Sequence, residues 1–303
     1  MISLGLNRLI ARQGRAGMKK LTRNIRILFG LIALSVGWMV YQIYSPAALQ
    51  PIRLPGEQRF QRHYTPQRVD RFWMRAQQEV YKSQGELLAQ NEREMRKGMN
   101  YRKLIRGNPN DQAIALTFDD GPHPQYSYQL LAILQRYRVK ATFFVVGKMA
   151  EQYPEIIRAE QASGHLIGNH TYHHVDLTKI PVDEVETEWL ACNDVVQAIT
   201  GNRIHFCRPP GGDYDTQVIT AAMRSGLTTV LWTDDPGDYA SPGEVTIEQR
   251  ALRRIGNGGI VLLHDGNPQT IDVLPQIIER FQRDGFHFLT VDAMARSVEK
   301  MRK

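Results

Sequence analysis

The longest uninterrupted apolar stretch of the chain lies near its N-terminus. Residues 27–41 read ILFGLIALSVGWMVY without a charged side chain, and after Gln42 the apolar residues Ile43 and Tyr44 follow. An α-helix of about 18 residues, rising roughly 1.5 Å per residue, spans about 27 Å, which is close to the hydrocarbon thickness of a bilayer. We therefore predict a transmembrane helix over residues 27–45, with Trp38, Tyr41 and Tyr44 at its outer interface.

Charged residues flank this stretch asymmetrically. Residues 1–26 contain seven Lys and Arg and no acidic residue, whereas the first basic residue after the stretch is Arg53. Because basic flanks stay in the cytoplasm, we expect a cytoplasmic N-terminus and export of everything after the helix. The alternative is a cleaved signal peptide with a weak cleavage site at Ala47 and Ala48, but the long apolar core favours a retained anchor in the cytoplasmic membrane.

Residues 46–110 carry only a patchy hydrophobic pattern. Prolines at positions 46, 51 and 55 open this segment, and a polar sequence rich in Arg, Gln and Glu follows. The apolar positions form an incomplete helical stripe that is interrupted at Gly85. We predict a linker followed by a helical stalk, or by a helix that lies on the next domain.

From residue 111 onward, short apolar runs alternate with amphipathic segments of helical period. The expected strands are residues 113–118, 141–146, 205–208, 228–232, 259–264 and 286–291. The expected helices lie near residues 129–138, 154–164, 181–199, 216–225, 247–255 and 271–284. Strands separated by helices indicate a parallel sheet, and this number of units favours an α/β barrel in one domain over residues 111–300.

Charge is distributed unevenly along the chain, whose formal net charge is +7. Residues 1–110 carry 20 Lys and Arg against 6 Asp and Glu, whereas the remaining residues carry 18 against 25. A nucleic-acid-binding protein should carry its basic surface on the folded domain itself. Because the predicted barrel is acidic, we exclude nucleic acid as a partner.

The two cysteines, Cys192 and Cys207, bear on compartment and on metal chemistry. They are too few for a disulfide framework or for a zinc site built from thiolates. A single disulfide in an exported domain is one interpretation. We favour the other, two small buried side chains, because free Cys is among the most buried residue types.

Unusual polar residues follow the predicted strands, at the barrel end where active sites form. Asp119 and Asp120 end the first strand, and because adjacent carboxylates repel, a cation or a shared proton should compensate them. His170 and His174 are spaced i, i+4, so one helical turn would place both imidazoles on the same side. Two imidazoles with one carboxylate form a common catalytic zinc set.

Three more clusters follow later strands: CRPPGGDYD around Arg208, WTDDPGDY around Asp238, and IVLLHDG with His264. Together with TFDDGP and H-T-x-x-H, the ordered motifs R-P-P-x-G, D-x-x-D and L-L-H resemble the polysaccharide deacetylase (NodB-homology) family, carbohydrate esterase family four. The resemblance covers about residues 111–296. It implies a distorted (β/α) barrel of about seven parallel strands.

The resemblance also assigns a metal site. It implies that Asp120, His170 and His174 hold a divalent metal, zinc by first expectation and cobalt or nickel as alternatives. In this assignment Asp119 is the base that takes a proton from the attacking water. Arg208 would pair with Asp119 and keep it ionised.

The remaining implied roles concern the leaving group and the substrate. His264 would protonate the departing amine, supported by Asp238, and the backbone N–H of Gly211 would bind the oxyanion. The family usually has an aromatic residue in place of Gly211 and a Trp in place of Tyr239. These two departures indicate an altered substrate pocket.

The function that follows is metal-dependent N-deacetylation of a polysaccharide containing N-acetylglucosamine or N-acetylmuramic acid. Peptidoglycan, chitin-like chains and exopolysaccharides are all candidate substrates. Two alternatives remain: a glycan-binding protein that has kept the fold and lost catalysis, and a deacylase of a lipid-linked sugar at the membrane. The sequence does not indicate an oligomeric state.

Overall fold

The computed structural model describes residue 72 and residues 80–253 and 255–301. The predicted cytoplasmic segment and transmembrane helix, residues 1–26 and 27–45, lie outside the described residues. Within the described ranges, no helix combines the length and the hydrophobicity that a membrane span requires.

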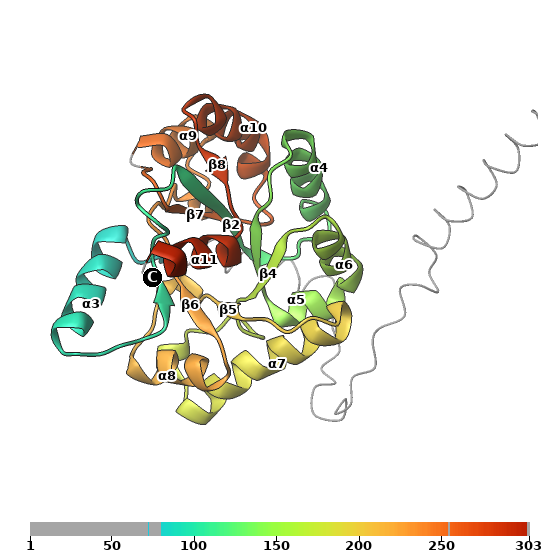
Figure 1. The fold of residues 1–303 in the computed structure, drawn as a ribbon. Helices are drawn as coiled ribbons and strands as arrows, with labels where there is room; N and C mark the ends of the chain where they lie inside the picture. Colours follow the sequence, from blue (N-terminus) through green and yellow to red (C-terminus); the bar gives the residue numbers. More distant parts are fainter. Residues whose placement is uncertain (1–71, 73–79, 254, 302–303) are drawn as a thin grey trace, which may run out of the picture. The chain divides into compact units, whose positions relative to one another are not determined.

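A parallel sheet forms the centre of the domain, with helices around it (Figure 1). Its strands are β1 Lys103–Leu104, β2 Ala113–Gly121, β3 Thr142–Val145, β4 Leu166–Asn169, β5 Phe206–Cys207, β6 Thr228–Val230, β7 Gly259–His264 and β8 His287–Phe288. Seven of them run in the order β1-β6-β5-β4-β3-β2-β7, and β8 pairs separately with the start of β2. Every residue of β2 and β7 is buried, as expected for parallel strands covered on both faces.

The sheet closes on itself through the residues that follow β6. Asp234 forms a parallel bridge with Val261 of β7, and the backbone N–H of Thr233 donates to the carbonyl of Ile260 over 3.0 Å. These bonds connect the segment after β6 with β7 and close the strands from β6 to β7 into an irregular ring. The predicted distorted (β/α) barrel of about seven parallel strands is thereby confirmed.

The helices cover the outside of the ring and one of its ends. They are α3 Gln84–Arg96, α4 Ser127–Tyr137, α5 Gly147–Gln152, α6 Pro154–Ala162, α7 Val182–Thr200, α8 Thr216–Arg224, α9 Glu244–Arg253, α10 Pro268–Arg283 and α11 Val291–Met301. The backbone N–H of Val291 donates to Thr142 Oγ1 at the start of β3, so α11 begins at the N-terminal end of the strands. The opposite end, where the predicted polar motifs lie, stays available for chemistry.

Each helix predicted beyond residue 111 is present, whereas β4, α5 and α11 were not predicted. The strand β4 is only four residues long and contains Gly168. A Cβ atom at Gly168 would lie 2.5 Å from Phe144 Cδ1, so glycine is required by the close packing of this strand. A short strand that contains glycine gives no hydrophobic alternation to detect.

The boundary predicted at residue 111 falls inside the folded domain, which begins earlier in the chain. Lys103–Leu104, assigned to the stalk from the sequence, instead pair with β6 in the sheet. The helix α3 begins with a capping box between Ser83 and Glu86, and its Leu87 is completely buried in the main core. Residues 80–110 are therefore part of the barrel domain, because Tyr81, Leu87 and Leu104 are buried in its core.

Cys192 of α7 and Cys207 of β5 are both buried and free. The interpretation as two small buried side chains is confirmed.

Candidate active site

Asp119 and Asp120 reach the same site because β2 is irregular at its end. Asp119 pairs with Phe144 and Gly121 with Val145, so Asp120 is an extra residue in the register between β2 and β3. Asp120 has a φ of 70°, a left-handed conformation that is uncommon for a residue other than glycine. Neighbouring strand residues normally face opposite sides, and this bulge brings both carboxylates to the carboxyl end of the barrel.

His170 and His174 lie in the loop after β4, and the predicted helical turn between them is wrong. Thr171 and His174 adopt left-handed φ values of 66° and 57°, and the backbone N–H of His174 donates to Thr171 Oγ1 over 2.9 Å. The loop nevertheless brings the two rings together, with centroids 4.9 Å apart. A loop with two left-handed residues, rather than a helix, therefore places both imidazoles beside Asp120.

These three residues form a cluster that fits a divalent metal. Asp120 Oδ1 lies 2.9 Å from His174 Nε2 and 3.4 Å from His170 Nε2. His170 Nδ1 lies 2.8 Å from the carbonyl oxygen of Arg208, which can only accept a hydrogen bond, so Nδ1 carries the proton and Nε2 presents its lone pair to the site. Among the described residues, His170 Nε2 is buried without a hydrogen-bond partner. Two imidazoles and one carboxylate match a catalytic zinc set.

The charge state of Asp120 agrees with this role. Burial by itself would raise the pKa of its carboxyl, but the neighbouring His174 holds the pKa well below its usual range. Asp120 is therefore a carboxylate inside the protein. A buried anion of this kind requires a positive partner.

Arg208 supplies the positive charge for the second carboxylate. Its Nη1 donates to Asp119 Oδ1 over 2.7 Å, and both side chains are completely buried. The same nitrogen donates to Thr117 Oγ1, and the guanidinium lies 4.3 Å from the centre of the Phe144 ring. In the described part of the chain, Asp119 Oδ2 is buried without a hydrogen-bond partner. One oxygen of Asp119 is thus held by Arg208 and the other is available for a ligand or a water.

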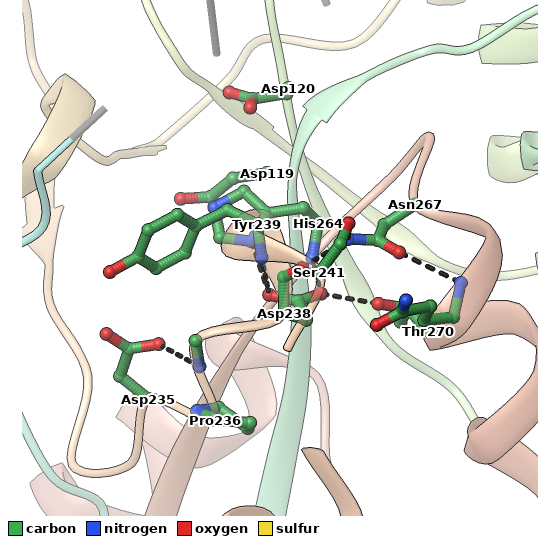
Figure 2. A network of polar contacts seen from close by, with 12 residues as sticks. Asp119, Asp120, Asp235, Pro236, Asp238, Tyr239, Ser241, His264, Asn267 and Thr270 are labelled. Atoms are coloured by element: carbon green, nitrogen blue, oxygen red, sulfur yellow. Dashed lines mark hydrogen bonds and ion pairs between the residues drawn. The ribbon is translucent and has the colours of Figure 1, made fainter. Parts of the chain in front are cut away.

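His264 and Asp238 form a second buried pair (Figure 2). His264 Nδ1 lies 2.7 Å from Asp238 Oδ1, and the backbone N–H of His264 donates to Asp238 Oδ2 over 2.8 Å. Thr270 also donates to Oδ2, and the backbone N–H of Tyr239 donates to Oδ1. Burial alone would lower the pKa of His264, but Asp238 overrides this effect and raises it to about 10. His264 is therefore a buried imidazolium at neutral pH.

Gly211 and Tyr239, the two positions that depart from the family pattern, flank this region. Gly211 is buried with a φ of 62°, a conformation that suits glycine. The ring of Tyr239 is half-buried and its centre lies 5.5 Å from that of His264. The structure thus brings all nine predicted site residues to the carboxyl end of the barrel or to the loops that surround it.

Two residues at the site were missed by the sequence analysis. Glu188 of α7 accepts from the backbone N–H groups of Tyr172 and His173 over 3.0 and 2.8 Å, between the two histidines of the metal cluster. Tyr81, from the segment before the barrel, packs against Tyr239 and His264. No local sequence pattern links either residue to the site, since both are distant from their partners along the chain.

Comparison with known proteins agrees with the motifs. Residues 106–230 match the family model described as polysaccharide deacetylase. A peptidoglycan-N-acetylglucosamine deacetylase of Bacillus cereus is 35% identical over 192 residues, 62% of this chain and 90% of that protein. A chitooligosaccharide deacetylase of Sinorhizobium fredii is 34% identical over 205 residues, 63% of this chain and 95% of that protein.

A solved structure bears on catalysis. The crystal structure of a pseudoenzyme of carbohydrate esterase family four from Bacillus anthracis superposes with a TM-score of 0.63 at 25% identity. The match covers 66% of this chain and 71% of that protein. The fold therefore also occurs in a protein that is described as a pseudoenzyme. Whether a chain with this fold is active depends on its own site residues.

Proposed function

Because the chain belongs to the polysaccharide deacetylase family, carbohydrate esterase family four, we propose that it removes N-acetyl groups from a polysaccharide containing N-acetylglucosamine or N-acetylmuramic acid. The observation that carries this proposal is the set of groups at one barrel end. The buried carboxylate of Asp119, the buried imidazolium of His264 and a cluster of three residues that could hold a metal ion lie together there. Amide hydrolysis needs a separate base and acid, and this arrangement supplies both.

Asp119 is the proposed general base. Its Oδ1 is held by Arg208, which orients the carboxylate, while Oδ2 accepts a proton from the attacking water. As that proton moves, the water oxygen bonds to the amide carbon. The backbone N–H of Gly211 is the proposed donor to the oxygen that becomes negatively charged.

His264 is the proposed general acid. It is protonated at neutral pH because of Asp238, and its Nε2 is a buried nitrogen without a hydrogen-bond partner among the described residues. Transfer of its proton to the amide nitrogen allows the carbon–nitrogen bond to break. Acetate leaves, and the sugar keeps a free amine.

We propose that Asp120, His170 and His174 hold a divalent metal, with zinc expected first and cobalt or nickel as alternatives. When bound, the metal lowers the pKa of water and polarises the amide carbonyl. The residues of the chain keep this cluster in position, since the carbonyl of Arg208 fixes the tautomer of His170.

The substrate class rests on the relatives. Those compared above are named for peptidoglycan N-acetylglucosamine and for chitooligosaccharides, and both carry N-acetyl groups on hexosamine sugars. Within this class we propose an envelope polysaccharide. We further propose that residues 27–45 anchor the enzyme in the cytoplasmic membrane and hold the barrel outside the cytoplasm, on the hydrophobicity and charge pattern of the sequence.

Acetate release tests the proposal. Full-length protein in detergent should release acetate from peptidoglycan fragments or chitooligosaccharides, and chelation should stop the reaction until zinc or cobalt is restored. Asp119→Asn should lower kcat by about 10²- to 10⁴-fold because the base is lost. The exposed Asp272 of α10 offers a matched control, since Asp272→Asn makes the same change away from the site. Full activity in Asp119→Asn would contradict the mechanism.

A catalytically silent glycan-binding protein is the second candidate, because a structurally similar protein is described as a pseudoenzyme. This chain keeps the proposed base, the proposed acid and the three residues that could hold a metal ion, which argues against a catalytically silent protein. Glycan binding that survives chelation, without acetate release from any glycan of the panel, would favour this candidate. A lipid-linked amino sugar included in the panel tests the deacylase alternative.

A further inference from the structure

The segment before the barrel contributes an aromatic ring to the active site. Tyr81 is only 7% exposed, and its ring centre lies 4.3 Å from that of Tyr239 and 4.9 Å from that of His264. The ring meets His264 edge to face at 72°, and Trp232 lies 6.1 Å away on the barrel. Tyr81 therefore occupies space directly beside the proposed general acid.

Lys82 attaches this segment to the loop that carries Gly211. The backbone N–H of Lys82 donates to the carbonyl oxygen of Gly211 over 3.0 Å, and its Nζ lies 2.9 Å from Asp213 Oδ1. Gly211 has no side chain that could pack beside His264 from this loop. These two contacts of Lys82 hold the backbone next to Tyr81. The ring of Tyr81 packs beside His264, where Gly211 offers no side chain.

We propose that Tyr81 is a positioning residue for His264. This inference rests on the function proposed above. The ring restricts rotation of the imidazole by contact and keeps water from the hydrogen bond between His264 and Asp238. A buried hydrogen-bonded ion pair is stronger in such a low-dielectric environment than in water. The segment before the barrel thus completes the active site rather than only spacing it from the membrane.

Steady-state kinetics of full-length variants give the first test. Tyr81→Leu keeps an apolar side chain but removes the aromatic ring, and we expect kcat to fall about tenfold while KM changes less than about twofold. Tyr81→Phe keeps the ring and should retain most of the wild-type kcat. Val80→Ala is the matched control, because Val80 precedes Tyr81 and is 83% exposed.

Proton NMR of the imidazole gives a second test that does not depend on turnover. The Nδ1 proton of His264, hydrogen bonded to Asp238, should give a slowly exchanging downfield signal in the wild type and in Tyr81→Phe. Exchange with water should be faster in Tyr81→Leu. If the wild type releases no acetate, the proposed function fails, but this comparison still decides the role of Tyr81.

Two outcomes would overturn the inference. In the first, Tyr81→Leu has wild-type kcat and wild-type imidazole exchange. In the second, Tyr81→Leu is more active than the wild type, which would show that the ring obstructs the pocket. Thermal unfolding of each variant identifies any loss of activity that comes from misfolding, and in that case the comparison of Tyr81→Phe with wild type decides whether the ring suffices.

Discussion

At the scale of single residues, the site is built from charges that are buried in pairs. Asp119 faces Arg208, and Asp238 faces His264, each pair at 2.7 Å. A buried charge that loses its partner is costly, so each member of a pair depends on the other. The protonation of His264 is the most directly measurable consequence.

Asp238→Asn should move the alkaline limit of activity to lower pH. In the wild type the pKa of His264 is raised to about 10, so the proposed proton donor should remain charged through neutral pH and lose its proton near that value. Without the carboxylate, burial lowers the pKa of the imidazole. The alkaline limb of kcat/KM should therefore shift toward neutral pH, whereas Asp272→Asn should keep the wild-type profile.

The raised pKa of His264 also makes the stability of the fold depend on pH. The stabilisation that protonated His264 contributes to the free energy of unfolding is fully present below the ordinary His pKa of 6.5 and is lost as pH rises through about 10. Urea unfolding of wild type should show a loss of stability over this alkaline range that Asp238→Asn lacks. An identical pH dependence in both proteins would contradict the assignment.

At the scale of elements, the metal cluster depends on a loop rather than on a helix. The loop after β4 is held from outside by Glu188, whose Oε2 accepts two backbone N–H groups and whose Oε1 lies 2.7 Å from His173 Nδ1. Because these contacts lie between His170 and His174, they limit how far the two imidazoles can separate. We therefore expect α7 to influence metal affinity without contacting the metal.

Glu188→Gln should weaken zinc binding by about 10- to 100-fold, the range seen when groups that orient metal ligands are changed. The amide oxygen can still accept from both backbone N–H groups, but the NH₂ group would then replace the carboxylate oxygen beside His173 Nδ1, and the negative charge would be lost. The exposed Glu184 of the same helix offers the matched control, since Glu184→Gln removes a charge away from the loop. Competition with a chelator of known affinity measures both variants, and equal affinities would remove Glu188 from this role.

The helix α3 belongs to the barrel domain at the same scale. Leu87 is completely buried, whereas its neighbour Leu88 is 43% exposed. Leu87→Ala should lower the free energy of unfolding by about 2–5 kcal/mol through the cavity that it leaves. Leu88→Ala should change it by less than about 0.5 kcal/mol. Urea denaturation measures both, and equal effects would mean that α3 is not packed as described.

At the scale of the whole molecule, the chain combines an acidic barrel with a basic, apolar N-terminal region. The barrel supplies the site, and the segment from residue 80 supplies Tyr81, so the site needs residues on both sides of the predicted domain boundary. The proposed anchor lies further toward the N-terminus. Catalysis and membrane attachment are therefore expected to be separable.

Deletion of residues 1–45 should release the protein from the membrane fraction while kcat/KM on a soluble chitooligosaccharide stays within about twofold, because the residues of the site are retained. Fractionation and acetate release measure the two properties. Retention of the shortened protein in the membrane would contradict the proposed anchor. A loss of activity with an unchanged melting temperature would show that the N-terminal region has a further role.

The amino-acid sequence by itself determined the alternation of strands and helices and the order of the motifs. These are local properties, since a buried parallel strand requires a continuous apolar run and a strand end requires a turn. The sequence therefore identified Asp119, Asp120, Arg208, Asp238 and His264 as candidates. It also determined the charge pattern from which the location is inferred.

Only the tertiary structure decided how these residues meet. The histidine pair converges through left-handed backbone in a loop, and the carboxylate pair through a bulge, neither of which the spacing indicated. Glu188 and Tyr81 reach the site because α7 and the segment before the barrel pack there. Contacts between residues distant in the chain depend on closure of the barrel and on side-chain packing. Neither can be predicted from local sequence patterns.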